Sequence, residues 1–172
     1  MFKKIVVYFI ILLFPMAVSA NVFDYPSSSK AISQKLPPLK SIACKFTQEK
    51  IVPNSNVVLK SGGDFEFIKN KGVIFRTTYP INAISSYKAS QNKRVNSILV
   101  AISNKNYSGI NEEFDLFYEK NNNFWVLGLR PKKASALANQ LSSITIKGDI
   151  NINCIVINTK DSGSTKILFD SN

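Results

Sequence analysis

The sequence predicts a mainly β (α+β) domain, a single antiparallel sheet curled into an unclosed barrel with a helical lid. Most of the chain consists of short segments in which apolar and polar residues alternate with a period of two, separated by turns rich in Gly, Pro and Asn. Two segments instead space their apolar residues as helices do, and short amphipathic helices can cover the concave apolar face of a curled sheet. A chain of 172 residues, 45% hydrophobic and 11% aromatic, suffices for one such core.

The first segment, residues 1–20, is predicted to be a signal peptide. Lys3 and Lys4 precede an unbroken apolar run, and Val18-Ser19-Ala20 places small residues where a signal peptidase cleaves. A transmembrane helix is the competing interpretation, but the apolar stretch is short and no basic stop follows it. We therefore expect cleavage after Ala20, and a single exported, periplasmic domain over residues 21–172.

Alternation predicts about nine strands in the remaining chain. Phe65 and Phe67 share one face of their strand, whereas Asp64 and Glu66 take the other. In the next strand Val73, Phe75, Thr77 and Tyr79 form one face, and strict alternation places Arg76 on the opposite one. The expected strands span residues 42–51, 57–68, 73–79, 81–89, 114–118, 124–129, 144–147, 150–158 and 164–169.

Helical spacing occurs in two further places after a short first helix at 27–36, which Pro37-Pro38 ends. The first is an apolar stripe at positions i, i+3, i+4 and i+7, formed by Val95, Ile98, Leu99 and Ile102. The second is a predicted helix that begins at Pro131, with the apolar residues Ala134, Leu137, Ala138 and Leu141. We expect these helices to cover the concave face of the sheet.

Composition argues against catalysis. The chain has no histidine and only two cysteines, which removes histidine-dependent nucleophiles and the usual zinc, copper and iron sites, so we expect no metal, no cofactor and no enzyme activity. In an oxidising compartment, the default expectation for Cys44 and Cys154 is a disulfide, and two buried free thiols are the alternative.

The net charge is +11, and +9 once Lys3 and Lys4 are removed. An exported basic protein most readily meets anionic lipid headgroups, acidic glycans or an acidic protein surface. Nucleic acid is not an expected partner, because the lysines are scattered and no nucleic-acid-binding motif is present.

Several motifs, in the same order along the chain, resemble those of the LolA-type outer-membrane lipoprotein carriers. The N-terminal ones are Cys44-Lys45-Phe46-Thr47-Gln48-Glu49-Lys50, Ser61-Gly62-Gly63-Asp64-Phe65 and Phe75-Arg76-Thr77-Thr78-Tyr79-Pro80. The C-terminal ones are Trp125-Val126-Leu127-Gly128-Leu129-Arg130-Pro131-Lys132 and the run from Asp161 to Phe169.

This resemblance implies an unclosed barrel with a helical lid that shuttles lipid-modified proteins across the periplasm. It also implies an inner-membrane ABC exporter and an outer-membrane acceptor as partners of a monomeric carrier without a cofactor. The family's lid-locking arginine has no direct counterpart here. The candidates for a lid latch are Lys69, Lys71 and Arg76.

The apolar faces of the strands and the lid stripe provide the candidate acyl-binding residues. They are Phe46, Phe65, Phe67, Val73, Phe75, Tyr79, Val95, Ile98, Leu99, Ile102, Trp125 and Leu127. For each of them a plain core role is the alternative.

Two other functions remain open. One is a basic periplasmic module that binds acidic glycolipid headgroups or glycans through surface lysines, without an acyl cavity. The other is a hydrolase that uses only carboxylates, with Asp64/Glu66 or Glu112/Glu113 as its pair, although these are more simply solvated charges.

Overall fold

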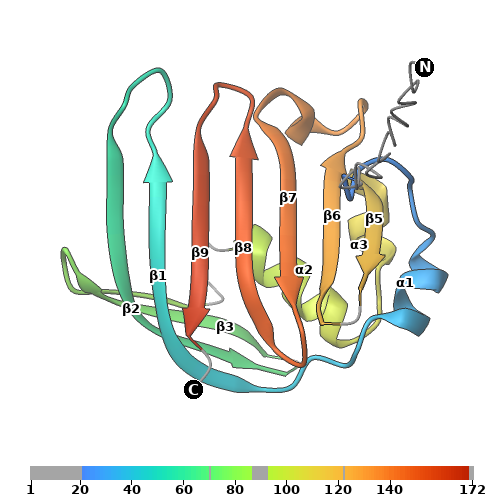
Figure 1. The fold of residues 1–172 in the computed structure, drawn as a ribbon, viewed down its shortest axis with the longest axis horizontal. Helices are drawn as coiled ribbons and strands as arrows, with labels where there is room; N and C mark the ends of the chain where they lie inside the picture. Colours follow the sequence, from blue (N-terminus) through green and yellow to red (C-terminus); the bar gives the residue numbers. More distant parts are fainter. Residues whose placement is uncertain (1–20, 70, 87–92, 122, 171–172) are drawn as a thin grey trace, which may run out of the picture.

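The computed structural model describes residues 21–69, 71–86, 93–121 and 123–170, and these form one antiparallel sheet with helices on one side (Figure 1). The nine strands of the sheet lie in the order β4-β3-β2-β1-β9-β8-β7-β6-β5. Strands β4 and β5 end the sheet without pairing with each other, so the barrel is not closed, which confirms the predicted fold class. The strands are β1 (Ile42–Ile51), β2 (Val58–Ile68), β3 (Gly72–Tyr79), β4 (Ala83–Ser86), β5 (Phe114–Lys120), β6 (Trp125–Pro131), β7 (Leu141–Gly148), β8 (Ile152–Thr159) and β9 (Ser164–Asp170).

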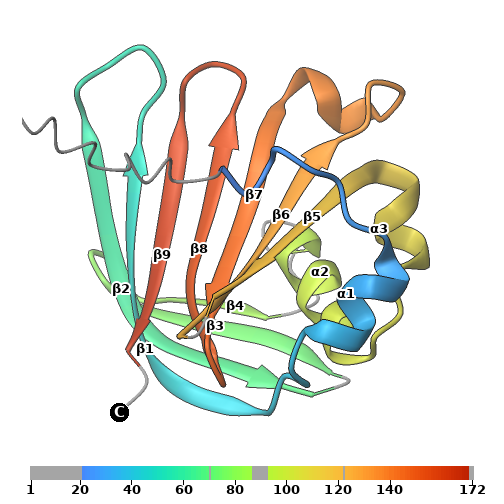
Figure 2. The same cartoon turned by 45° about the vertical axis from the view of Figure 1, so that its right-hand side comes forward.

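The sheet is strongly curved at one end. The lower parts of β1 and β2 bend so that β3 and β4 run across beneath the other strands (Figure 2). This curvature creates the concave face that the helices cover, as expected for a long twisted antiparallel sheet.

Three α-helices are described, α1 (Ser29–Lys35), α2 (Lys93–Ser103) and α3 (Ser108–Glu113), together with the 3₁₀ helix η2 (Ala136–Asn139). Helix α1 begins at Ser28, whose side-chain oxygen accepts the backbone N–H of Ala31, and its C-cap Leu36 directly precedes two prolines. Helix α2 lies within the curve of the sheet, and α1 and α3 lie near β5 (Figure 2). The apolar stripe predicted at 95–102 therefore belongs to the helix that covers the concave face.

Alternation along the strands determines which side chains reach the core. In β2 the residues Gly63, Phe65 and Phe67 are buried, while the intervening Asp64 and Glu66 are only partly buried. The core is a single cluster that joins residues of β1, β2, β3 and β5–β9 to the helices. One sheet face thus packs against the helices and the other carries the charged side chains.

Tyr79 does not point inward as predicted, because the register of β3 shifts before it. Thr77 lies opposite Gly63, but Tyr79 lies opposite Gly62, so Thr78 is an extra residue in β3. A bulge of this kind reverses the alternation, and the side chain of Tyr79 is 62% exposed. The bulge depends on Gly63, where a Cβ would lie 1.9 Å from the carbonyl oxygen of Arg76.

Three other expectations about elements need correction or fall outside the described residues. The helix predicted from Pro131 to Leu141 is only the four-residue η2, because Pro131 ends β6 and Leu141 begins β7. Helix α3 was not predicted. The strand expected at 81–89 is described only as Ala83–Ser86, since residues 87–92 lie outside the described part, as does the expected signal peptide at 1–20.

Candidate functional site

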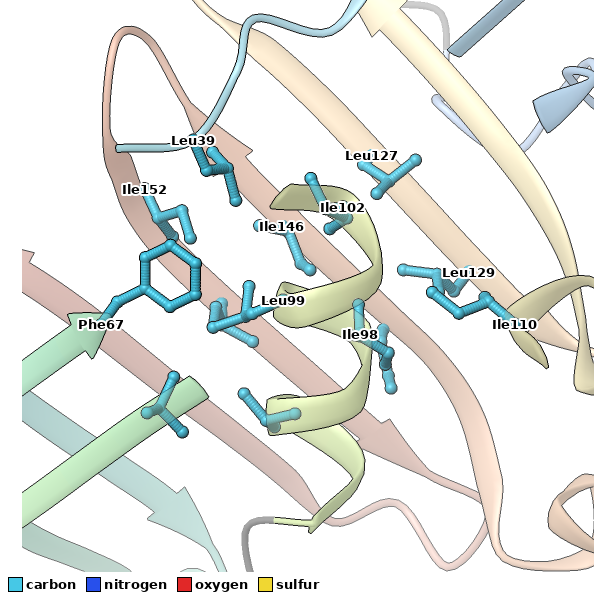
Figure 3. Packing of buried hydrophobic residues seen from close by; sticks show 14 of the residues in the cluster. Leu39, Phe67, Ile98, Leu99, Ile102, Ile110, Leu127, Leu129, Ile146 and Ile152 are labelled. Atoms are coloured by element: carbon cyan, nitrogen blue, oxygen red, sulfur yellow. The ribbon is translucent and has the colours of Figure 1, made fainter. Parts of the chain in front are cut away.

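The apolar stripe of α2 is wholly buried against the concave face. Leu99 has no exposed surface, and Val95, Ile98 and Ile102 are each at least nine-tenths buried. Figure 3 shows Ile98, Leu99 and Ile102 among side chains from β2, β6, β7, β8 and α3, namely Phe67, Leu127, Leu129, Ile146, Ile152 and Ile110. The sequence prediction of a covering helix at this position agrees with this packing.

An aromatic cluster forms the floor of the concave face. The rings of Phe46 and Phe75 meet edge to face with centroids 5.1 Å apart, and Phe65 lies 4.9 Å from Phe75 and 4.3 Å from Phe169. Edge-to-face and tilted ring pairs are favourable because the positive edge of one ring meets the negative face of the other. The four rings fill the space between β1, β2, β3 and β9.

The remaining candidate acyl-binding residues also lie in this core. Phe67, Val73 and Leu127 are buried, and Trp125 is buried with its indole Nε1 donating to the carbonyl oxygen of Asp149 at 2.7 Å. Apart from Tyr79, every candidate acyl-binding residue therefore belongs to one continuous apolar cluster.

Helix α2 is also joined to the sheet by a side-chain hydrogen bond. Oδ1 of Asn96, in the first turn of the helix, accepts the backbone N–H of Val73 in β3 at 3.0 Å. Asn96 is not among the site residues predicted from the sequence. The one indication available was its place beside Val95, at the border of the apolar stripe.

The three latch candidates are placed differently. Arg76 points to the outer face of the sheet, where its Nη1 lies 3.3 Å from Oε2 of Glu66, so its guanidinium points away from the face that α2 covers. The backbone N–H of Lys69 donates to Oγ of Ser41 at 3.0 Å. Lys71 lies beside α2, lining with Asn96 and Val100 an open depression of about 600 Å³ on the outer flank of α2 and α3. Of the three candidates, Lys71 is therefore the one placed next to α2.

A second depression lies on the concave face itself, beyond the N-terminal turn of α2. It has a volume of about 480 Å³ and opens to solvent between β1, β2, β3, β8 and β9. Its apolar lining comes from Phe46, Phe75, Val95, Ile157 and Ile167, and its polar lining from Gln48, Lys50, Ser61, Thr77 and Thr165. We call it the concave pocket. Alternation from Phe46 through Gln48 to Lys50 was the sequence feature that could have predicted it.

The predicted disulfide between Cys44 and Cys154 is wrong, since both residues are free thiols. Cys44 in β1 lies opposite Phe65 and packs against the core, whereas Cys154 in β8 lies opposite Lys147 and Leu168, which are exposed. The two side chains thus point to opposite faces of the sheet, with β9 between their strands. No disulfide can join two such positions.

One of the two carboxylate pairs considered for a hydrolase, Asp64/Glu66, forms ion pairs on the outer face. Asp64 pairs with Lys45 and Glu66 with Arg76, and a third pair joins Glu49 to Lys60 at 3.1 Å. These pairs are solvent-exposed and contribute about 0–1 kcal/mol each. Among the described residues, no group of three or more His, Cys, Asp or Glu side chains could hold a metal ion.

One buried polar group near the helices has no partner. The hydroxyl of Tyr107, which lies between α2 and α3, makes no hydrogen bond with any other described residue, and Tyr107 is only 4% exposed. Burial, with a smaller contribution from Tyr118, raises the pKa of Tyr107 to about 12. The helical side of the core thus contains an uncompensated polar atom.

These observations define an antiparallel β protein whose concave apolar face is covered by α2 and opens beside it into a pocket. None of the helices in the described part of the chain is long and apolar enough to span a bilayer. No known family matches the sequence, and no curated protein matches it. Among solved structures, the chain is similar to that of a LolA superfamily protein from Nitrosomonas europaea, with 10% identity and a TM-score of 0.40 over 84% of this chain and 92% of that chain.

Proposed function

We propose that this protein is a soluble periplasmic carrier that binds the acyl chains of lipoproteins, or of another lipid, on the concave face of its sheet. The acyl chain enters through the concave pocket and takes the place of the apolar stripe of α2. The carrier receives its cargo from an inner-membrane ABC exporter and delivers it to an outer-membrane acceptor. The observation that best supports this proposal is the burial of the α2 stripe against the aromatic floor, next to an open pocket.

The size and lining of the pocket suit the entry of an acyl chain. Its volume of about 480 Å³ lies within the range of about 300–1,000 Å³ that is usual for ligand sites. Val95, in the first turn of α2, forms part of its wall together with Phe46 and Phe75. A chain that enters the pocket therefore contacts the lid and the apolar floor at once.

The apolar stripe of α2 and an acyl chain gain similar free energies from burial on the concave face. Four buried apolar side chains of α2 contribute roughly 6–12 kcal/mol, at about 1.5–3 kcal/mol each. A palmitoyl chain that buries its roughly 14 methylenes gains roughly 11 kcal/mol, at about 0.8 kcal/mol per methylene. Such a near balance allows reversible exchange between lid and cargo, which a carrier requires because it must also release what it binds.

The proposal is tested with a neutral acyl ligand, monopalmitin, and with a synthetic diacylated lipopeptide. We expect both to bind, and we expect amide hydrogen exchange in α2 to accelerate on binding while β7 and β8 stay protected. Absence of binding, or binding that leaves exchange in α2 unchanged, contradicts the proposal.

A pair of neighbouring substitutions places the binding site. Thr165 lines the concave pocket, and Lys166 is the next residue of β9 and points to the outer face. Thr165→Trp should block monopalmitin binding by filling the pocket, whereas Lys166→Trp should leave it unchanged. Circular dichroism confirms that both variants fold.

A further inference from the structure

The formal charge of the concave pocket is carried by a single residue. Among the ten residues that line it, Lys50 is the one cation and none is acidic. The pocket therefore presents one positive charge beside an apolar surface.

Lys50 is not neutralised by an ion pair with another described residue. The ion pairs within 4 Å in the described part of the chain engage Lys45, Lys60 and Arg76, all on the outer face. The charge of Lys50 helps to lower the pKa of Asp161, in the turn between β8 and β9, but no ion pair within 4 Å joins these two residues. The ammonium of Lys50 thus remains open to a ligand.

The polarity of the pocket changes in one direction along β1. Phe46 is buried in the aromatic floor, Gln48 is partly exposed and Lys50 is exposed. At about 3.3 Å per residue, the Cα atoms of Phe46 and Lys50 are roughly 13 Å apart. On the neighbouring strand β9, Ile167 lies at the apolar end and Thr165, directly opposite Lys50, lies at the polar end. One end of the pocket therefore suits a hydrocarbon tail and the other a charged group.

We propose that the concave pocket selects amphiphiles with an anionic head group, whose carboxylate or phosphate binds the ammonium of Lys50 while the acyl tail lies on Phe46 and Phe75 toward α2. This inference rests on the proposed acyl-carrier function and adds the class of head group to it. The head group stays at the solvent-exposed end, so only the tail must displace the lid.

Matched ligands and variants test the inference. Palmitate is compared with hexadecanol, and lysophosphatidylglycerol with lysophosphatidylcholine, each pair having the same kind of tail but differing in net charge. The variants are Lys50→Gln and, as the control, Lys60→Gln, which removes a lysine on the outer face of the adjacent strand. Affinities are measured below the critical micelle concentration, at one ionic strength.

We expect Lys50→Gln to weaken palmitate binding about fivefold, equivalent to about 1 kcal/mol, and to leave hexadecanol binding unchanged. Lys60→Gln should change neither affinity. If Lys50→Gln loses affinity for lysophosphatidylglycerol to the same extent, anionic phospholipids are identified as ligands. If it loses affinity for palmitate alone, free fatty acids are identified.

Two results overturn the inference in different ways. If the Lys50→Gln substitution changes the affinity for palmitate no more than the affinity for hexadecanol, the selection by charge is refuted while acyl binding stands. If none of the four ligands binds, the proposed carrier function itself fails, and the inference fails with it.

Discussion

The side chain of Asn96 accepts the backbone N–H of Val73 at 3.0 Å, which hydrogen-bonds the first turn of α2 directly to β3. The N–H of Val73 faces α2 at the end of the ladder between β3 and β4, where pairing begins only at Ile74. Displacement of α2, which the proposed function requires, would expose this N–H to water. The hydrogen bond therefore favours the covered state of the concave face.

Asn96→Ala should make the lid easier to displace. The substitution leaves a partly buried N–H without a partner in the covered state, at a cost of about 1 kcal/mol, which corresponds to a roughly fivefold larger open population. Stopped-flow uptake of a fluorescent fatty acid should accelerate by about this factor. Asn104→Ala, which removes an amide beyond the C-terminal end of α2, serves as the control, and equal rates in both variants would show that the hydrogen bond from Val73 to Asn96 does not hold α2 in place.

Tyr107→Phe should stabilise the protein, because it removes a buried hydroxyl that has no hydrogen-bond partner in the part of the chain that the structure describes. We expect a gain of about 1 kcal/mol in the free energy of unfolding, measured with urea. Tyr118→Phe is the matched control and should instead lower the free energy of unfolding, since the Tyr118 hydroxyl donates to the carbonyl oxygen of Lys35 at 3.1 Å. A loss of stability in Tyr107→Phe would mean that its hydroxyl has a partner in solution.

Tyr107 should also make the fold sensitive to alkali. Its pKa is raised from 10.0 to about 12 in the folded state, so the neutral phenol is the favoured form there. The free energy of unfolding does not depend on the titration of Tyr107 below pH 10 and falls as the pH rises from 10 toward 12, because the unfolded chain releases its proton first. The free energy of unfolding, measured with urea, should fall more steeply with pH over this interval in the wild type than in Tyr107→Phe. Equal pH dependence in the two proteins would contradict a raised pKa of Tyr107.

Sequence patterns predicted the parts of the fold in which one physical rule dominates. Strict alternation located the strands, and the spacing of Val95, Ile98, Leu99 and Ile102 located α2, because both patterns reflect burial of a continuous apolar face. The errors occur where backbone geometry overrides the pattern. Tyr79 follows a bulge, and Leu141 and Pro131 satisfy a helical spacing although they belong to two adjacent strands.

The candidate site was predictable only in part. The aromatic floor follows from the alternation of Phe46, Phe65 and Phe75, but the pocket beside it depends on how far the sheet curls. Its polar lining comes from residues of four strands, and no local pattern brings Lys50, Thr77 and Thr165 together. The free thiols show the same limit, since the face that Cys154 takes depends on the bulge opposite Gly148.

Gly63→Ala should destabilise the protein by about 3 kcal/mol, within the range of severe single substitutions. The added Cβ would lie 1.9 Å from the carbonyl oxygen of Arg76, so β3 must move away from β2 at the bulge. The control is Gly109→Ala in α3, where a Cβ meets no atom within 4 Å and alanine should stabilise the helix by about 0.5–1 kcal/mol. Urea unfolding of both variants gives the comparison, and a small effect of Gly63→Ala would show that the bulge is not held by this close approach.

Both cysteines should remain reduced even after purification under oxidising conditions. Cys44 and Cys154 point to opposite sheet faces, so no native rearrangement short of breaking the sheet can join them. Thiol titration in denaturant should find two thiols in the wild type and one in Cys44→Ala or Cys154→Ala. In the folded protein the reaction should be slow, because burial raises the pKa of both thiols, with Asp170 adding to the effect at Cys44. A wild-type protein without titratable thiols that stays monomeric in non-reducing gels would contain the intramolecular bond, and the strand arrangement from β1 to β8 would then be wrong.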